Sequence, residues 1–291
     1  MEGGGRMTRS VMILGATGML GHELVRRVAP KRRVVAVSRA GFGAEYGAVE
    51  DRLPELTAPA IDLLIDRHRP DVVVNAIGLV KQRGEASQPA LAIAVNSLFP
   101  HVLAERCGVA GVRAIHFSTD CVFTGRKGYY SEDDPPDADD LYGRSKLLGE
   151  IAGPGALTLR TSMIGPELSA RQGLLEWARS QRGRTVQGYR KAVFSGLPTI
   201  CLADVVEMLV DEHPQLSGLY HVAASPISKY ELMHLLNNRY DLKLTIEPAD
   251  VPVCDRTLNG SRFRDATGFV ARSWPEMIEM MAQGTEEREH V

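Results

Sequence analysis

The chain has 291 residues, of which 44% are hydrophobic and 24% charged, and its formal net charge is −2. This composition suits a large globular protein, and a near-neutral charge without a basic cluster argues against a nucleic-acid partner. No apolar run is long enough to span a bilayer, and the start "MEGGGRMTRS" lacks the apolar core of a signal peptide. The four cysteines are far apart and form no C-x-x-C pair, so we expect no zinc or other metal site, no disulfide framework, and a reducing, cytoplasmic setting.

The first half of the chain alternates short β-branched runs with helical patterns. Strands are expected at 10–14, 32–38, 71–77 and 112–118, and helices at 19–29, 60–68 and 89–107. The strands are continuous apolar runs, which indicates that both of their faces are buried. Strand–helix alternation of this kind predicts an α/β fold, a doubly wound parallel sheet covered by helices on both sides.

Beyond residue 164 the pattern loosens. Helices are expected at 174–182, 203–213, 229–240 and 275–282, and strands at 218–224 and 244–247. The strand at 218–224 is expected to return to the main sheet as its last strand. The remaining segments predict a smaller C-terminal lobe that is assembled from separate parts of the chain.

A glycine-rich turn, "LGATGMLG", follows the first strand and opens the first helix. Gly15, Gly18 and Gly21 have the spacing G-x-x-G-x-x-G. Such glycines allow a sharp turn, a close approach of the backbone to a pyrophosphate, and tight packing of the helix on the strand. At the first strand–helix junction of an α/β pattern, the motif predicts a dinucleotide site rather than a mere tight turn. The residues expected to bind the cofactor here are Gly15, Thr17, Gly18, Met19, Leu20 and Gly21.

The end of the second strand indicates which dinucleotide binds. Sites for NAD usually place Asp or Glu there to hold the ribose 2′-hydroxyl, whereas this chain has Ser38 and Arg39. Arg39 could hold a 2′-phosphate or be a solvated surface residue. The missing acid and the arginine together favour NADPH over NADH.

Two further stretches carry residues with possible chemistry. "FSTDCVF" places Ser118 and Thr119 at the carboxyl end of a buried strand, where ligands of open α/β sheets collect, although such clusters also cap turns. A long polar loop then leads to "DDLYGRSKLLGE", in which Tyr142 and Lys146 share one face of a predicted helix. By itself this pair favours a tyrosine packed on the sheet beside a solvated lysine over a catalytic pair.

The combination of GxxGxxG, "STD.VF.G", "Y.EDD.P.....YGRSK..GE" and "LRTS" resembles the extended short-chain dehydrogenase/reductase family. Within it, the pattern is most similar to the dTDP-4-dehydrorhamnose reductase group of sugar-nucleotide reductases. The likeness runs from Ser10 to Ser162 and is looser beyond. It implies a Rossmann-type dinucleotide-binding domain at 7–165, to which 193–224 returns, and a smaller substrate-binding lobe at 166–291.

The resemblance also implies a catalytic triad of Thr119, Tyr142 and Lys146. A ketone that receives a hydride develops negative charge on its oxygen and needs a proton. Tyr142 would donate that proton, and Thr119 would hydrogen-bond the same oxygen. Lys146 would bind the nicotinamide ribose and lower the pKa of the tyrosine toward working pH.

Other positions match the family pattern. The implied cofactor contacts are Asn75, Ala76, Ile77, Gly78, Asn96, Ser118, Tyr142, Lys146, Arg160 and Thr161, with Asn96 also supporting the active-site backbone. The candidate substrate contacts are Lys81, Thr119, Arg190 and Lys191, the last two for a diphosphate. Two departures concern the substrate: Cys121 replaces the tyrosine of "STDYVF", and Met163 replaces the usual aromatic after "RTS".

The implied activity is NADPH-dependent reduction of a nucleotide-linked keto-sugar, a 4-keto-6-deoxyhexose, by a protein that could form a homodimer. An epimerase on the same fold stays open. A dehydratase needs a Glu after Thr-Asp, where this chain has Cys121, which counts against dehydration. A non-catalytic dinucleotide-binding regulatory subunit is a third alternative, because a fold does not fix a function.

Overall fold

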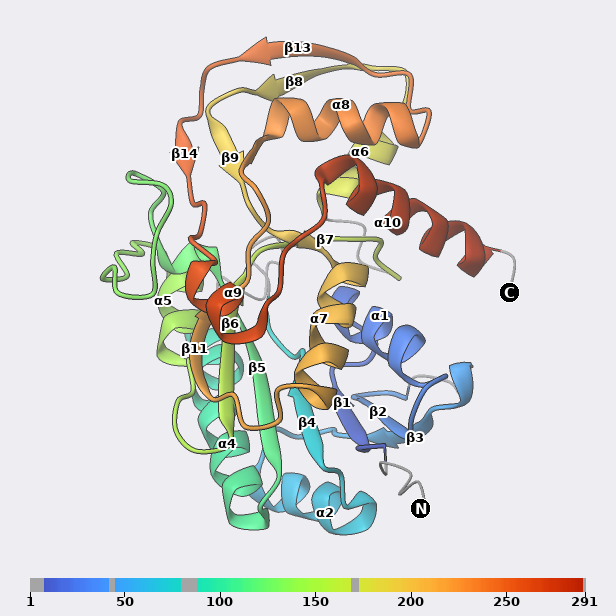
Figure 1. Cartoon of the computed structure of the whole chain (residues 1–291), viewed down its shortest axis with the longest axis vertical. Coiled ribbons are helices and arrows are strands. Elements are labelled where there is room, and N and C mark those ends of the chain that lie inside the picture. Colours follow the sequence, from blue (N-terminus) through green and yellow to red (C-terminus); the bar gives the residue numbers. More distant parts are fainter. Residues whose placement is uncertain (1–7, 42–44, 80–87, 169–172, 290–291) are drawn as a thin grey trace.

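A parallel seven-stranded sheet forms the centre of the lower half of the molecule in Figure 1. The computed structural model describes residues 8–41, 45–79, 88–168 and 173–289. The strands of the sheet are β1 (Val11–Leu14), β2 (Val34–Ser38), β3 (Val49–Arg52), β4 (Val72–Asn75), β5 (Arg113–Thr119), β6 (Ala156–Thr161) and β11 (Gly218–His221). Their order is β11-β6-β5-β4-β1-β2-β3, with every neighbouring pair parallel. This confirms the predicted Rossmann-type α/β architecture.

Helices cover both faces of this sheet, because successive side chains of a buried strand point to opposite faces. Val11 and Ile13 of β1 belong to one hydrophobic cluster, and Met12 and Leu14 to the other. The helices α1 (Met19–Val28) and α7 (Thr199–Asp211) pack together on the first face, and α2 (Ala58–His68) and α4 (Phe99–Ala110) on the second.

The helical run predicted at 89–107 contains an irregular turn. It consists of α3 (Pro89–Ala92), a π-helical turn at Ile93–Leu98 and then α4. The next helix, α5 (Leu141–Leu148), begins where the Asp140 carboxylate accepts a hydrogen bond from the Gly143 amide at 2.8 Å. Such a side-chain cap satisfies an amide that the helix leaves without a partner.

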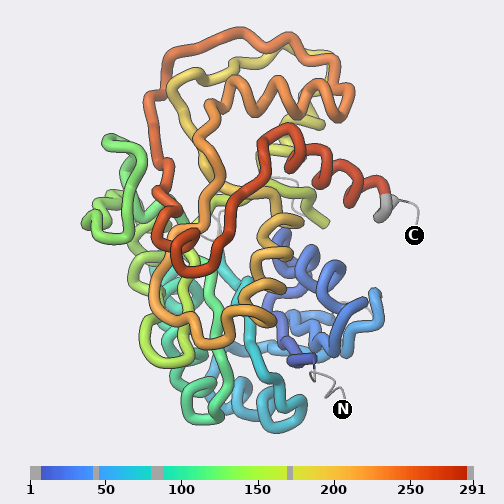
Figure 2. The backbone as a smooth tube through the Cα atoms, in the orientation of Figure 1, coloured from blue at the N-terminus to red at the C-terminus, as the bar shows by residue number. Residues whose placement is uncertain are grey.

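The upper half of the molecule is built from two later stretches of the chain, drawn from yellow to red in Figure 2. Small sheets form there: β8 (Thr185–Tyr189) with β13 (Thr245–Ala249), β9 (Ala192–Phe194) with β12 (Ile227–Ser228) and β14 (Cys254–Asp255), and β7 (Met163–Ile164) with β10 (Leu197–Pro198). The helices of this half are α6 (Leu174–Ser180), α8 (Lys229–Arg239) and α10 (Trp274–Glu289), whereas α9 (Ser261–Thr267) lies against β11 of the main sheet. Side chains of α8 and α10 belong to the same buried cluster as α1 and α7, so one continuous core joins the two halves.

The segment 199–221, which lies between the two stretches of the upper half, returns to the lower half. Helix α7 packs on α1, and β11 pairs with β6 at the edge of the main sheet. The division into domains at 7–165 and 166–291 stays a prediction. The strands β3, β6, β8 and β9 and the two-residue strands were not predicted from the sequence. None of the helices in the described ranges is long and apolar enough to cross a membrane.

Candidate active site

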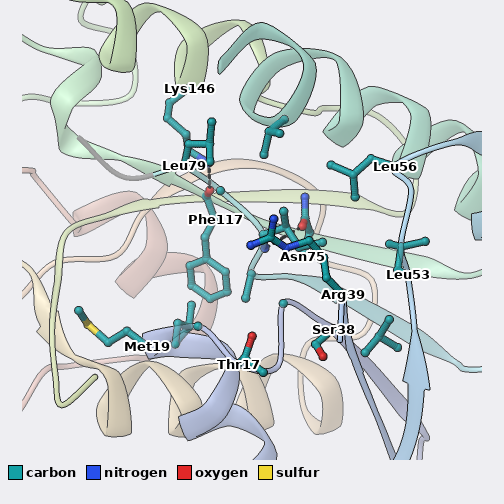
Figure 3. Close-up of a pocket in the computed structure, with 18 of the residues that line it drawn as sticks. Thr17, Met19, Ser38, Arg39, Leu53, Leu56, Asn75, Leu79, Phe117 and Lys146 are labelled. Atoms are coloured by element: carbon teal, nitrogen blue, oxygen red, sulfur yellow. Dashed lines mark hydrogen bonds between the residues drawn. The ribbon is translucent and has the colours of Figure 1, made fainter. Parts of the chain in front are cut away.

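A cavity of about 440 Å³ opens at the carboxyl ends of β1, β2, β4 and β5. The strand order reverses between β1 and β4, and this is where open α/β sheets bind their ligands. Figure 3 shows Thr17 and Met19 on one side of the cavity and Lys146, Leu79 and Phe117 toward the other. Fourteen of the predicted cofactor residues line it: Gly15, Thr17, Gly18, Met19, Leu20, Ser38, Arg39, Asn75, Ala76, Ile77, Gly78, Ser118, Tyr142 and Lys146.

The glycine turn has the shape that a pyrophosphate requires. Gly15 has φ +87°, and a Cβ there would lie 3.0 Å from the backbone of Ala76. A Cβ at Gly21 would lie 2.1 Å from the carbonyl oxygen of Gly15, so only glycine lets α1 start so close to β1. No side chain caps the first turn of α1 at Gly18, and its amide groups and helix dipole favour an anion at the cavity wall. These features fit a dinucleotide, although Gly21 itself packs behind the lining.

The two residues at the end of β2 differ in their surroundings. The buried Ser38 hydroxyl accepts a hydrogen bond from the Gly41 amide at 3.0 Å, which shapes the turn after the strand. Arg39 is exposed and lines the cavity. Within the described part of the chain, no carboxylate pairs with Arg39, so its guanidinium is available to a phosphate.

Lys146 is buried at the end of the cavity next to β5. Its ammonium donates to the carbonyl oxygen of Phe117 at 2.6 Å and lies 3.5 Å from Nε2 of His116. Burial lowers the pKa of Lys146 to about 8, and the Glu150 carboxylate opposes this shift. On its other side, His116 contacts the Asn75 amide at 3.1 Å, so a chain of polar contacts links the cofactor loop after β4 to the lysine.

The side chains of Thr119 and Tyr142 are hydrogen-bonded to each other. The Thr119 hydroxyl donates to Asp120 at 3.2 Å and accepts from the Cys121 amide at 3.1 Å. Burial raises the pKa of Tyr142 above its ordinary value, the Cys121 thiol adds to this shift, and a hydrogen bond with Thr119 opposes it. The net shift of this pKa is thus upward, opposite to the lowering expected from Lys146, because burial of the phenol dominates.

Asn96 does not line the cavity but holds its wall. It lies in the π-helical turn, and such turns are frequent at functional sites. Its side-chain oxygen accepts from the Leu79 amide at 2.8 Å, and its amide nitrogen donates to the Ser145 hydroxyl at 3.2 Å. The Ser145 hydroxyl in turn donates to the carbonyl of Tyr142 at 2.9 Å. Asn96 thus couples the loop after β4 to the first turn of α5.

Arg160 and Thr161 lie on β6, away from the cavity. The buried Arg160 guanidinium binds both carboxylate oxygens of Glu150, each at 2.7 Å. Glu150 also accepts from the Ser118 hydroxyl at 2.6 Å. The Thr161 hydroxyl donates to the next carbonyl, that of Ser162, at 3.1 Å. The structure therefore places Arg160 in an ion pair beneath the catalytic strand, and its contact with a cofactor stays a prediction.

Three of the candidate substrate residues, Thr119, Arg190 and Lys191, are not among the residues that line this cavity. Lys81 lies outside the described residues. Arg190 is about half exposed and binds Asp250 through two contacts of 2.9 and 2.7 Å, and Lys191 is exposed. Neither Arg190 nor Lys191 lines the cavity, so their role also stays a prediction.

The apolar walls of the cavity were not predicted from the sequence. These are Val37, Leu53, Pro54, Leu56, Leu79, Leu91, Val95, Phe117 and Met163, and the carboxylate of Glu167 joins them. Leu53 and Leu56, to one side in Figure 3, follow the edge strand β3. In the sequence, the signal for these two leucines is the short segment that follows "VEDR". The residues "VEDR" themselves are too charged to be recognised as a buried strand. In the part of the chain that the structure describes, no group of three or more His, Cys, Asp or Glu side chains could hold a metal ion.

Comparison with known proteins agrees with this geometry. The family model described as RmlD substrate binding domain matches residues 8–285. A probable low-salt glycan biosynthesis reductase of Haloferax volcanii is 31% identical over 222 residues, which cover 73% of each chain. A hypothetical dTDP-4-dehydrorhamnose reductase from Sulfolobus tokodaii is 27% identical, with a TM-score of 0.76 over 91% of this chain and 97% of its own. The dTDP-4-dehydrorhamnose reductase of Bacillus anthracis, crystallised with NADP, shares the fold at 19% identity, with a TM-score of 0.76 over 94% of this chain and 99% of its own.

Proposed function

The chain belongs to the RmlD substrate-binding domain family, and from this premise we propose that it is an NADPH-dependent reductase of a nucleotide-linked keto-sugar, a 4-keto-6-deoxyhexose. The observation that carries the proposal is a single cavity whose wall contains both the glycine turn and the pair Tyr142 and Lys146. A dinucleotide bound along this cavity would extend from α1 to the proton donor. The names of the similar proteins, a glycan biosynthesis reductase and dTDP-4-dehydrorhamnose reductases, support the substrate class.

The residues of the cavity have distinct roles toward the cofactor. The turn at Gly15 and the first turn of α1 bind the pyrophosphate, and Arg39 binds the 2′-phosphate that distinguishes NADPH. Lys146 binds the nicotinamide ribose from the position in which the Phe117 carbonyl holds it. NADP in the crystallised relative supports this choice of dinucleotide. The bound nicotinamide supplies the hydride for the carbonyl carbon of the sugar.

Side chains of this protein, rather than the cofactor, protonate the sugar oxygen. Tyr142 donates its phenolic proton to the oxygen, and the Thr119 hydroxyl donates a hydrogen bond to it. Burial raises the pKa of Tyr142, which keeps the phenol protonated at neutral pH, as a proton donor requires. Asn96 and Ser145 hold the backbone of the helix turn that carries the phenol.

The alternatives have less support. A dehydratase needs a base at the position of Cys121, and burial raises the pKa of this thiol to about 12, so the thiol stays protonated at neutral pH. An epimerase would use the same triad but return the hydride to the sugar. A regulatory subunit would bind the dinucleotide without using Tyr142.

A panel assay tests the proposal. Purified protein is mixed with NADPH and a set of dTDP- and UDP-linked 4-keto-6-deoxyhexoses, and NADPH oxidation is followed together with the sugar product. We expect one NADPH to be consumed for each sugar reduced with at least one member of the panel. Sugar conversion without net NADPH consumption would favour the epimerase, and NADPH binding without any conversion would favour the regulatory subunit.

The cytoplasm is the compartment that we propose, because the four cysteines are all free.

A further inference from the structure

Glu150 continues the row of the tyrosine and the lysine, one helical turn further along the chain. Tyr142, Lys146 and Glu150 are spaced by four residues, which places their side chains on one face of a helix. The turn continues past the end of α5, because the Glu150 amide donates to the Leu147 carbonyl at 3.1 Å. The Glu150 carboxylate accepts a hydrogen bond from the Ser118 hydroxyl at 2.6 Å. Glu150 thus joins the helix of the catalytic pair to the end of β5.

The Arg160 guanidinium holds the Glu150 carboxylate in place. Its Nε and Nη2 atoms each lie 2.7 Å from a carboxylate oxygen, and only 4% of the arginine side chain and 11% of the glutamate side chain are exposed. The third nitrogen, Nη1, lies 3.3 Å from Nε2 of His221. Since Nδ1 of His221 donates to the Tyr130 carbonyl at 3.0 Å, its Nε2 is left to accept from Arg160. All three nitrogens of the guanidinium are therefore bound, which fixes the carboxylate.

Glu150 also acts on the charge of Lys146. Burial lowers the pKa of Lys146 to about 8, and the Glu150 carboxylate opposes this shift, so it offsets part of the cost of burying an ammonium. The contacts of the ammonium itself are with neutral groups, the Phe117 carbonyl at 2.6 Å and the His116 imidazole at 3.5 Å. Without the carboxylate, a smaller fraction of Lys146 would be charged near neutral pH.

The neighbouring groups keep one charge state while the lysine titrates. The titratable or charged side chains around Lys146 and Glu150 are Tyr142 on α5, His116 on β5, Arg160 on β6, His221 on β11 and, behind His116, His101 on α4. Burial lowers the pKa of His116 well below its ordinary value and that of His221 to about 3, so both stay neutral above pH 6.5. Burial raises the pKa of Tyr142, which stays protonated, and a guanidinium stays charged in proteins.

We propose that Glu150 is a positioning residue of the active site: held by Arg160, its carboxylate orients Ser118 and keeps Lys146 charged. This rests on the proposed function and deepens it, because it assigns the group that maintains the charge of the lysine. Glu150 does not line the cavity and acts through Lys146 and Ser118, which do.

The charge of Lys146 can be measured without cofactor or substrate. In protein labelled with ¹³C at lysine Cε, the NMR signal of Lys146 is identified by its absence in Lys146→Met, and its titration midpoint is compared between variants. In the unmodified protein about half of Lys146 should be charged at pH 8. Glu150→Gln keeps an oxygen that can accept from Ser118 but removes the charge, so the charged fraction at pH 8 should fall about twofold or more.

Glu176→Gln is the matched control. Glu176 is buried to the same degree, with 12% of its side chain exposed, and it pairs with Arg179 on α6. This variant should keep the midpoint of the unmodified protein. Glu150→Gln should also melt at a lower temperature, because it leaves Arg160 unpaired. A purely structural role of Glu150 predicts that lower melting temperature with an unchanged midpoint of Lys146, and this result would overturn the proposal.

A double variant keeps the test decisive if Glu150→Gln does not fold. Glu150→Gln combined with Arg160→Met removes both members of the buried ion pair and so avoids the costly unpaired guanidinium. The midpoint of Lys146 should still lie below that of the unmodified protein, because burial then acts without the carboxylate. An equal midpoint in the double variant would overturn the proposal.

Failure of the positioning role and failure of the proposed function can be told apart, because the titration uses neither NADPH nor a sugar. A lowered midpoint in Glu150→Gln, together with no reduction of any keto-sugar, would reject the reductase and leave the role of Glu150 standing. Reduction of a keto-sugar together with an unchanged midpoint would reject the role of Glu150 and leave the reductase standing.

Discussion

Cationic side chains are buried on one side of the catalytic strand β5 and half-buried on the other. On the cofactor side, Lys146 is bound by the Phe117 carbonyl, and beneath the strand Arg160 is bound by Glu150. On the far side, Lys229 and Arg256 have no carboxylate partner among the described residues. The cofactor side thus holds its cations within the fold, whereas on the far side Asp120 acts electrostatically on both cations without a direct ion pair among the described residues.

This difference follows from how each side is built. The cofactor side uses the backbone of a rigid parallel sheet, with Gly15 and Gly21 placed so that no side chain obstructs the turn. The far side uses strands of two or three residues, β9, β12 and β14, that come from separate parts of the chain. Variants of the first side should therefore affect the cofactor and the proton.

The largest effect is expected for Tyr142→Phe. Loss of the proton donor should lower kcat by about two to four orders of magnitude, the usual range for acid–base catalysis. NADPH binding and the melting temperature should be retained, because the ring stays in place. Steady-state kinetics with the best sugar of the panel measures this, and a near-normal kcat would exclude the proton-donor role.

A somewhat smaller effect, about a hundredfold in kcat/KM, is expected for Lys146→Met, because it removes both a ribose contact and a positive charge beside the phenol. The pKa of Lys146 is about 8, so the ammonium is charged below pH 8 and loses its charge as the pH rises through that value. NADPH affinity of the unmodified protein should accordingly fall above pH 8, and that of Lys146→Met should not. Titrations from pH 6.5 to pH 9.5 check this, and parallel profiles would contradict it.

Thr119→Val should lower kcat by about tenfold to a hundredfold and change the Kd of NADPH little. The lost hydrogen bond strengthens as the sugar oxygen gains charge, so its effect falls mainly on the transition state. Valine has nearly the shape of threonine, which keeps the packing of the buried site. An equal loss of NADPH binding would instead indicate a structural role.

The smallest effect is expected for Arg39→Ala, which should narrow the preference for NADPH over NADH by about tenfold. The reason is that Arg39 lines the cavity and, among the described residues, has no ion pair to compete with a 2′-phosphate. Fluorescence titration with both dinucleotides measures the preference. NADH binding as tightly as NADPH to the unmodified protein would contradict this account of the cofactor.

The same contrast explains what the sequence could predict. The glycine turn, Thr119, Tyr142 and Lys146 lie in short local motifs, and their placement follows from strand–turn–helix geometry. The strands of the main sheet were also visible as apolar runs, apart from β3, whose residues are exposed and charged, and β6, whose motif was noted without its strand.

The contacts on the far side could not be predicted from short local motifs. Lys229 and Arg256 are distant in sequence, and only the pairing of β12 and β14 with β9 brings them together. Arg190, chosen from a basic turn, proves to bind Asp250, a partner 60 residues away. The wrong direction for the pKa of Tyr142 has a similar origin, since burial depends on the packed structure and not on the spacing of two residues.

The most direct test of the central claim follows the hydride itself. NADPH that carries deuterium at the transferable position of nicotinamide C4 is incubated with the panel sugar that gives the fastest NADPH oxidation. The mass of the sugar product is then measured by mass spectrometry. A reductase gives a product that carries one deuterium at the former carbonyl carbon, with one NADP formed for each sugar. A converted sugar without deuterium, or an unchanged amount of NADPH after conversion, would contradict the account.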